Sequence, residues 1–303
     1  MATTYQVNAL NGNTNFFASP YGLGMNLFTN YSHSSYNGLQ FDARRRLSKG
    51  VQLQVNYTYG KVLSDTSGDA QTRFDPFLDA NNGSIERARA IFDVTHVIRA
   101  NGVYELPMGK GHTWNPPNPV LNRIVSGWNV GAIMTKQSGT PFSVLSGRGT
   151  LNRAARSGAT NTANTTLNKS QLDSLIGFRM TGNGPYIIDL TAIGADGRGV
   201  AADGAAPFTG QAFTQPTAGN IGALQRRYFS GPWNFALDFS AQKVTNITER
   251  QTLEFRMDST NILNHPTFDV SGDYNLTATT FGRITGTGFA GRRLIQFGLI
   301  YRF

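Results

Sequence analysis

The sequence predicts an all-β fold: an antiparallel transmembrane β-barrel segment of about 7–8 meandering strands with long extracellular loops, open or incomplete as a barrel. Three observations predict it. Apolar and polar residues alternate with period two in several segments, and the connections between these segments are alternately short and long. The last such segment ends flush with an aromatic residue, Phe303. Period two places alternate side chains on opposite faces of a strand.

The composition favours a membrane barrel over other classes of protein. Only 15% of the residues are charged, against about 25% in ordinary globular domains. No run of about 18 apolar residues is present, which excludes a transmembrane helix, whereas a barrel strand needs apolar residues only at alternate positions. The absence of Cys excludes disulfides, thiolate metal sites and thiol nucleophiles.

Seven segments carry the alternation. It is strictest at residues 51–59, 233–242 and 252–258, where Val51, Leu53 and Val55, for example, oppose Gln52, Gln54 and Asn56. Four further segments alternate less strictly, at residues 39–44, 98–105, 128–135 and 295–303. Ile133 and Ile300 interrupt the polar face in two of them. Each segment suits a barrel strand of about 9–11 residues.

The connections alternate in length. Residues 47–50 and 245–248 form tight turns and residues 107–123 a medium link, whereas about 61–92, 138–232 and 263–291 are long loops that we assign to the extracellular side. A short helix at 170–178 is the best helical segment. Seven strands place the C-terminus on the short-turn side. We therefore divide the chain into a preceding strand end and loop (1–33) and the C-terminal part of a barrel (34–303).

Signals of catalysis and nucleic-acid binding are lacking. The net charge of +9 is spread along the chain, and no basic helix is present. No nucleophile elbow, zinc-protease or phosphate-loop motif occurs, and the four His are scattered. We therefore expect no enzyme, no nucleic-acid partner, and no catalytic, cofactor-binding or metal site.

Three groups of candidate residues follow from the strand pattern. The candidates for the lumen side are Gln52, Gln54, Asn56, Glu254, Arg256 and Asp258, of which the last three are expected to pair with one another. Aromatic residues near strand ends would sit at the membrane interfaces; these are Tyr57, Tyr59, Trp128, Trp233 and Tyr301. The terminal alternation of Phe297, Leu299, Tyr301 and Phe303 resembles the signal read by the outer-membrane barrel-insertion machinery.

An ordered series of motifs extends over residues 34–303. It consists of Ser-Tyr-Asn-Gly-Leu-Gln at 35–40, Gly-Val-Gln-Leu-Gln-Val-Asn-Tyr-Thr-Tyr at 50–59, Phe-Asp-Val-Thr-His-Val at 92–97, Tyr-Glu-Leu-Pro at 104–107, Gly-Trp at 127–128, Gly-Thr-Pro-Phe at 139–142, Phe-Arg-Met-Asp-Ser-Thr-Asn-Ile-Leu-Asn-His-Pro at 255–266, Phe-Gly-Arg-Ile-Thr at 281–285, and Phe303. This series resembles the C-terminal β-barrel of TonB-dependent receptors of the Oar-like type, which often carry a carboxypeptidase-regulatory-like domain and abound in Acidobacteria. Ser259 and Thr260 depart from the family, whose members usually carry aromatic residues there.

The resemblance implies a fragment of a Gram-negative outer-membrane transporter for energised uptake of a large or scarce solute. Its partners would be outer-membrane lipid, the insertion machinery, an unknown solute and, in the full-length parent, the plug domain and TonB. Such a receptor has about 22 strands. The signal peptide, absent from this chain, is expected in a missing N-terminal part.

Two alternatives remain open. Tyr5, Val7 and Ala9 alternate with polar residues and would add a strand to complete a self-contained eight-stranded barrel, acting as an adhesin or anchor. The other is a soluble all-β carbohydrate-binding module. A module of this kind would stay monomeric without detergent, whereas an open barrel sheet would aggregate through its free edges.

Overall fold

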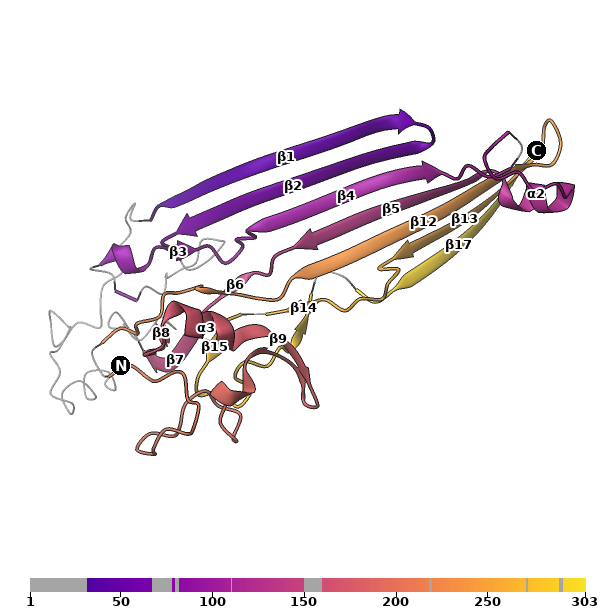
Figure 1. Ribbon diagram of the computed structural model, residues 1–303. Helices are drawn as coiled ribbons and strands as arrows, with labels where there is room; N and C mark the ends of the chain where they lie inside the picture. Colours follow the sequence, from indigo (N-terminus) through magenta and orange to yellow (C-terminus); the bar gives the residue numbers. More distant parts are fainter. Residues whose placement is uncertain are drawn as a thin grey trace.

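A long sheet with a globular lobe at one end makes up the molecule (Figure 1). The computed structural model describes residues 32–66, 78–79, 82–109, 111–149, 160–217, 220–270, 272–288 and 291–303. The expected strand through Tyr5, Val7 and Ala9, and nearly all of the segment 1–33, lie outside these residues. None of the helices in the described ranges is long and apolar enough to cross a membrane.

The sheet is an antiparallel meander of long strands, each hydrogen-bonded to the next along the chain. The long strands are β1 (Ser34–Ser48), β2 (Val51–Ser64), β4 (His96–Glu105), β5 (Trp128–Gln137), β12 (Asn234–Asn246), β13 (Thr252–Thr260) and β17 (Leu294–Arg302). All the alternating segments of the sequence are strands, so the all-β prediction is confirmed. Within the described residues β1 and β17 have a long-strand neighbour on one side only, and the sheet stays open.

One end of the sheet, which we call the turn end, carries short connections and the C-terminus. β1 and β2 are joined through Lys49 and Gly50, whose φ values of 52° and 75° are those of a tight hairpin turn. At this end Thr252 pairs with Arg302, next to the last residue. The C-terminus therefore lies on the short-turn side, as the strand count predicts.

The medium link between β4 and β5 contains a helix that the sequence analysis did not identify, α2 (Pro119–Val125). The Asn118 side chain accepts hydrogen bonds from the backbone N–H groups of Val120 and Leu121, and Pro119 occupies the first turn. Asn at the N-cap followed by Pro is a strong start signal for a helix. This signal was visible in the sequence.

The other end, the lobe end, carries the long connections. The loop expected from about 61 begins later, because β2 continues to Ser64. After it come the 3₁₀ helix η1 (Gly83–Ile85) and β3 (Ala88–Arg89), which pairs with the end of β2. The described parts of the two longest connections, 138–233 and 261–293, fold together into a body that we call the lobe (Figure 1).

The lobe has its own secondary structure, so these connections are not irregular loops. Its elements are β6 (Pro141–Phe142), β7 (Val144–Gly149), β8 (Thr160–Thr162), α3 (Lys169–Leu175), β9 (Ile176–Thr181), β10 (Gly184–Ile188), η2 (Leu190–Ala192), β11 (Phe229–Ser230), β14 (Phe268–Asp269), β15 (Tyr274–Asn275) and β16 (Gly286–Thr287). The two connections interlock, because β15 from the second pairs in parallel with β7 from the first.

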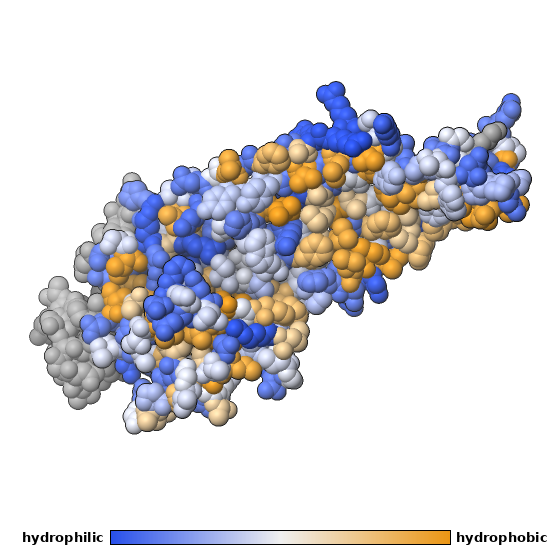
Figure 2. All heavy atoms as spheres, in the orientation of Figure 1, coloured by the Kyte–Doolittle hydropathy of each residue, from blue (hydrophilic) through white to orange (hydrophobic). Residues whose placement is uncertain are grey.

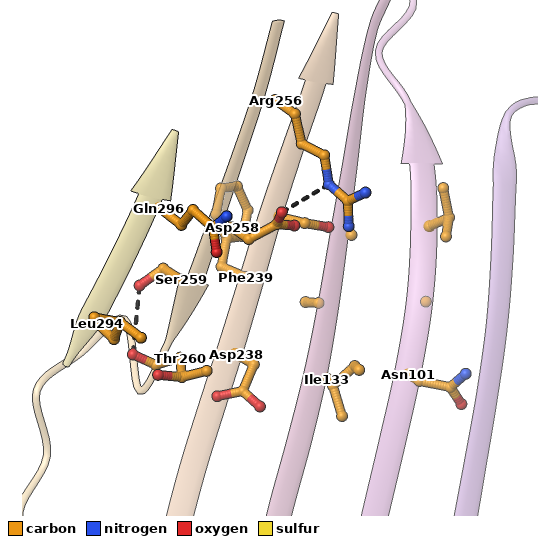
Figure 3. A pocket seen from close by; sticks show the side chains of 15 residues that line it. Asn101, Ile133, Asp238, Phe239, Arg256, Asp258, Ser259, Thr260, Leu294 and Gln296 are labelled. Atoms are coloured by element: carbon orange, nitrogen blue, oxygen red, sulfur yellow. Dashed lines mark hydrogen bonds and ion pairs between the residues drawn. The ribbon is translucent and has the colours of Figure 1, made fainter. Parts of the chain in front are cut away.

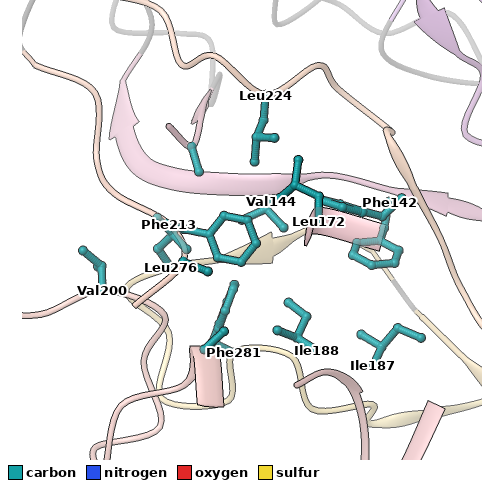
Figure 4. Close-up of a cluster of buried hydrophobic side chains, with 14 of the residues drawn as sticks. Phe142, Val144, Leu172, Ile187, Ile188, Val200, Phe213, Leu224, Leu276 and Phe281 are labelled. Carbon is teal, nitrogen blue, oxygen red and sulfur yellow. The ribbon is translucent and has the colours of Figure 1, made fainter. Parts of the chain in front are cut away.

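The main hydrophobic core of the molecule lies in the lobe and not under the sheet. Side chains from both connections meet in it, among them Phe142, Phe213, Leu276 and Phe281, all fully buried (Figure 4). Phe213 and Phe281 pack edge to face with ring centroids 6.0 Å apart. Burial of aromatic rings is the largest apolar contribution that a small core has. The lobe is therefore held together as a small globular domain.

The helix expected at 170–178 is shorter and begins one residue earlier. α3 starts after Asn168, which forms a capping box with Gln171. It ends at Leu175, because Ile176 is extended and pairs with Ile188 in the β9–β10 hairpin. Leu172 of this helix is buried in the lobe core.

The last connection leaves β13 through a tight turn that depends on two Asn residues. Asn261 and Asn264 have φ values of 46° and 50°, a left-handed conformation that Asn tolerates better than most residues. The Asn261 N–H donates to Asp238 Oδ1 at 2.8 Å, and its side-chain amide donates to the His265 and Gly291 carbonyls. The Asn-Ile-Leu-Asn-His-Pro motif thus fixes where the sheet ends and the lobe begins.

We expect Asp189→Ala to loosen the lobe by about 1 kcal/mol, the usual cost of losing a helix cap. The Asp189 carboxylate accepts hydrogen bonds from the Thr191 N–H and hydroxyl and lies 3.1 Å from Arg179. The Thr191 bonds and the Arg179 charge lower the Asp189 pKa. A carboxyl group whose pKa is lower in the folded protein contributes its full stabilisation of the fold at pH values above its unfolded-state pKa of about 3.9.

That stabilisation is lost as the pH falls through the pKa of Asp189 in the folded protein. Protease digestion of the lobe at pH 7 and at pH 3 measures it. The wild type should become more sensitive at the lower pH, and Asp189→Ala should show a smaller change. An equal change in both proteins would contradict this role of Asp189.

Candidate functional site

The strand register sorts the side chains of the long strands onto two faces. Across the middle of the sheet, Gly102 of β4, Ala132 of β5 and Phe239 of β12 are direct partners. Directly paired residues point to the same side of a sheet, and chain neighbours point to opposite sides. The alternation in each strand therefore continues coherently across the whole sheet.

We call these the apolar face and the polar face. The apolar face carries Leu39, Phe41, Leu53, Val55, Tyr57, Tyr59, Ile98, Ala100, Tyr104, Val130, Ala132, Met134, Phe235, Leu237, Phe239, Leu253, Phe255, Met257, Ile295, Phe297, Leu299 and Tyr301. The polar face carries Gln40, Asp42, Arg44, Gln52, Gln54, Asn56, Arg99, Asn101, Asp238, Ser240, Gln242, Glu254, Arg256, Asp258, Gln296 and Arg302. All six residues predicted for the lumen side share the polar face.

The apolar face is uncovered. Its edge residues Leu39, Phe297 and Leu299 are 66%, 66% and 69% exposed, and hydrophobic residues lie at the surface over the strands in Figure 2. Soluble monomers rarely expose a contiguous apolar patch larger than a few hundred Å². A face of this kind is typical of a sheet that borders lipid.

The acidic residues of the long strands are confined to one face of the sheet. Every carboxylate of the long strands lies on the polar face: Asp42, Glu105, Asp238, Glu254 and Asp258. The charged residues of the apolar face are all basic and lie towards strand ends: Arg45, Lys61, Lys136 and Lys243. Long basic side chains at such ends can keep their charge in the polar boundary while their stems cover apolar surface.

Several charged residues of the polar face form ion pairs. Arg256 and Asp258 form an ion pair at 2.7 Å, as predicted for neighbours on one strand face. Glu254 pairs instead with Arg302 of β17 at 2.7 Å and accepts a hydrogen bond from Gln242. The expected mutual pairing of all three residues of β13 was therefore wrong for Glu254, because its paired neighbours on β12 and β17 offer closer partners.

A second polar network lies on β1 and β2. Asp42 pairs with Arg44 at 2.7 Å and accepts hydrogen bonds from Gln54 and Asn56. Gln54 and Asn56 were predicted to share a face, and the register adds their partner strand. Gln52 lies on the same face, opposite Val103.

Between these networks the polar face is hollowed. A cavity of about 420 Å³ is bordered by Asn101, Ile133, Asp238, Arg256, Asp258 and Gln296, among others (Figure 3). Its floor is low because Gly131 of β5 has no side chain and faces Ser240. Ile133, which interrupts the polar pattern of β5, lies in this hollow. A concave site with an apolar floor and a few polar groups suits a small polar molecule or a side chain of another domain.

The predicted aromatic residues gather at the two ends of the apolar face. At the lobe end the His96 ring lies 5.3 Å from Tyr59 and 5.7 Å from Trp233, and the Lys136 ammonium lies 5.5 Å from the centre of Trp233. The hydroxyl of Tyr57 is 2.9 Å from His96 Nδ1. We call these five residues the lobe-end cluster. His96 and Lys136 were not identified from the sequence, because neither belongs to the aromatic pattern.

The turn end carries a second aromatic group. Trp128 and Phe255 pack edge to face at 6.0 Å, and Tyr301 and Phe303 lie 5.8 Å apart. From Trp128 to Lys136 the chain covers about 26 Å along β5 at about 3.3 Å per residue. This separation is close to the apolar band of about 25 Å that outer-membrane barrels present.

A buried ion pair fastens the β2–β4 connection to the lobe, and the sequence did not predict it. Glu86 and Arg226 lie 3.2 Å apart, with side chains only 1% and 8% exposed. Arg227 next to it donates to the carbonyls of Arg89 and Thr66. Arg89 in turn pairs with Asp93 at 2.7 Å and donates to Ser230. We call Glu86 and Arg226 the latch.

Metal ligands do not gather in the described part of the chain: no group of three or more His, Asp or Glu side chains there could hold an ion. The candidate features of the sheet are therefore the open hollow on its polar face and the uncovered apolar face.

Comparison with known proteins agrees with this geometry. A family model described as an outer membrane beta barrel domain matches residues 2–296. Neither the curated proteins nor the solved structures gave a match. The family match covers nearly the whole chain and accounts for the meander, the uncovered apolar face and the two aromatic ends; the chain belongs to the outer membrane beta barrel domain family.

Proposed function

We propose that this chain forms the C-terminal wall of a TonB-dependent receptor of the Oar-like type, which takes up a large or scarce solute across the outer membrane with energy from TonB. The observation that carries the proposal is the open sheet. Its polar face is concave and holds paired charges, while β1 and β17 lack a second long-strand neighbour in the described part. Further strands are needed to close a barrel around that face, because an edge in lipid leaves backbone groups unpaired.

The two faces define the arrangement in the proposed receptor. The apolar face borders lipid, and the polar face with Gln52, Gln54, Asn56, Glu254, Arg256 and Asp258 borders the lumen, where a plug domain would sit. The exposed side chains of Phe297, Leu299, Tyr301 and Phe303 form the C-terminal strand pattern for the barrel-insertion machinery. The ordered motif series over residues 34–303 supports this assignment over other outer-membrane barrels.

The lobe defines the orientation. Long loops lie outside the cell and short turns in the periplasm in bacterial barrels. We therefore place the lobe on the extracellular side, where its surface would form part of the recognition surface for the solute. An uncovered apolar face also supports a membrane protein over a soluble carbohydrate-binding module, which would bury that face.

The mass of the native protein tests the receptor proposal. An antibody against the 138–232 segment is applied to a detergent-extracted outer-membrane fraction. A band far above 33.0 kDa is expected, because the proposed receptor includes a plug and further strands. A heat-modifiable band near 33 kDa would overturn the proposal and favour a self-contained small barrel that acts as an adhesin or anchor.

A separate experiment tests the orientation. Because this chain contains no Cys, a single introduced Cys is its only site for a thiol-reactive label. A single Cys replaces Asp203, whose side chain in the lobe is 78% exposed, or Thr248 in the β12–β13 turn. A membrane-impermeant maleimide should label the Asp203→Cys variant on intact cells and the Thr248→Cys variant only after the outer membrane is opened. The reverse pattern would contradict the orientation.

A further inference from the structure

We propose that the lobe-end cluster is a binding site for the phosphate group of an outer-leaflet membrane lipid, with Lys136 and His96 as the phosphate ligands and Trp233 and Tyr59 as the adjoining interfacial rings. The site rests on the orientation proposed above but not on a transport function. It would belong to any barrel that carries this wall with the lobe outside.

Among the described residues, the charge of Lys136 has no ion-pair partner. Every carboxylate of the long strands lies on the opposite face. Its nearest ring is Trp233, at 5.5 Å. A cation at the edge of an apolar face is costly unless an anion or water meets it. In a membrane, the anion at this depth is the phosphate of a lipid headgroup.

The turn end shows that this need is specific to the lobe end. There Lys243 lies 5.7 Å from the centre of the Trp128 ring, an arrangement that matches Lys136 and Trp233. The Lys243 ammonium, however, donates to the backbone carbonyls of Arg123 and Ser126. The protein itself therefore satisfies Lys243 at the turn end and leaves Lys136 at the lobe end available to a ligand.

His96 is held in position for the same ligand. Its backbone N–H donates to the Ser138 hydroxyl at 3.1 Å, and its carbonyl accepts the Ser138 N–H at 2.9 Å. The hydroxyl of Tyr57 forms a hydrogen bond with Nδ1 of His96. In the tautomer in which the Tyr57 hydroxyl donates to Nδ1, Nε2 carries the ring hydrogen and can donate it to a phosphate oxygen. Trp233 lies close to both His96 and Lys136, so one indole ring joins the two basic side chains in the same cluster.

The position of the cluster selects a lipid over a soluble phosphate. It lies beside the exposed apolar residues of the sheet, about 26 Å along the strand from Trp128. Trp and Tyr prefer this headgroup level, and basic residues there attract anionic headgroups. A lipid would place its phosphate against Lys136 and His96 and its acyl chains against the apolar face.

Phosphatidic acid and diacylglycerol form a matched pair of probes, because they differ only in the phosphate. The native outer-membrane protein that carries this chain is purified in a neutral detergent, and lipid binding is measured by native mass spectrometry. We expect phosphatidic acid to bind more tightly than diacylglycerol. Lys136→Gln should weaken the binding of phosphatidic acid about fivefold, as expected for one basic residue near a membrane surface. Lys136→Arg should restore this binding.

Lys243→Gln is the control, since it removes the matching cation at the turn end and should leave phosphatidic acid binding unchanged. Equal binding of diacylglycerol, no effect of Lys136→Gln, or an equal loss in Lys243→Gln would each overturn the site. Displacement of the lipid by inorganic phosphate at equal concentration would show a soluble-phosphate site and overturn the lipid assignment. Heat-modifiable gel mobility confirms that each variant is folded, and the labelling of Asp203→Cys separates a wrong orientation from a failed site.

Discussion

Arginine in place of Ala132 is expected to block membrane assembly of this wall. Ala132 lies at the middle of the apolar face, between Gly102 and Phe239. An Arg on the lipid face near the bilayer midplane costs about 2–4 kcal/mol. That is a large part of the margin by which proteins are stable. The amount of heat-modifiable, folded protein in the outer membrane should therefore fall sharply.

The next residue along β5 supplies the control. Ile133 is at the same height but points into the hollow of the polar face, where it is 57% exposed (Figure 3). Arginine there can reach Asp238 or Asp258 and water, so Ile133→Arg should assemble close to the wild-type level. If Ile133→Arg fails and Ala132→Arg assembles, the assignment of the two faces is reversed.

Removal of the Glu86 carboxylate is expected to release the β2–β4 connection from the lobe. Glu86→Ala removes the ion pair between Glu86 and Arg226, and breaking a buried ion pair costs about 3–5 kcal/mol. Opening of this connection should then become at least about a hundredfold more frequent, because each 1.4 kcal/mol is a factor of ten. The rate of trypsin cleavage at Arg87 and Arg89, under conditions where cleavage follows the open population, measures it.

Two comparisons make the experiment specific to the latch. Asp173→Ala removes a carboxylate from an exposed pair with Lys169 and should leave cleavage nearly unchanged. Glu86→Leu combined with Arg226→Met replaces both charges by apolar side chains and should be less sensitive than Glu86→Ala alone. Similar cleavage of Glu86→Ala and Asp173→Ala would mean that the buried pair does not hold the connection.

Local pattern predicted the sheet well, because the determinants of a barrel strand lie within the strand. Val51 to Asn56 alternate on their own, and any antiparallel neighbour in register must continue the two faces. The turn at Lys49 and Gly50 and the position of Phe303 at the turn end follow in the same way. The helix α2 was equally predictable from Asn118 and Pro119, although this signal was overlooked.

The lobe was not predictable by the same reasoning. Phe142, Phe213 and Phe281 show no common period in the sequence, because each comes from a different part of the two long connections and they meet only in three dimensions. The same holds for the latch, whose two residues come from separate connections. Long-range contacts of this kind depend on which loops lie side by side, and no local rule determines that.

The ion pairs of the polar face also differ in whether the sequence alone predicts them. Arg256 and Asp258 are two residues apart on one face of a strand, so their pairing is a local consequence of period two. Glu254 turns to Arg302 because the register of β13 with β17 places these strands side by side.

The sequence by itself determined the strands, their two faces, the short and long ends and the aromatic positions, since all of these follow from side-chain alternation along single segments. Only the tertiary structure decided that the long connections fold into a lobe with its own core, and that His96, Lys136 and Trp233 meet at the lobe end. These features arise where strands and loops that are distant in the sequence come into contact, and only tertiary packing determines such contacts.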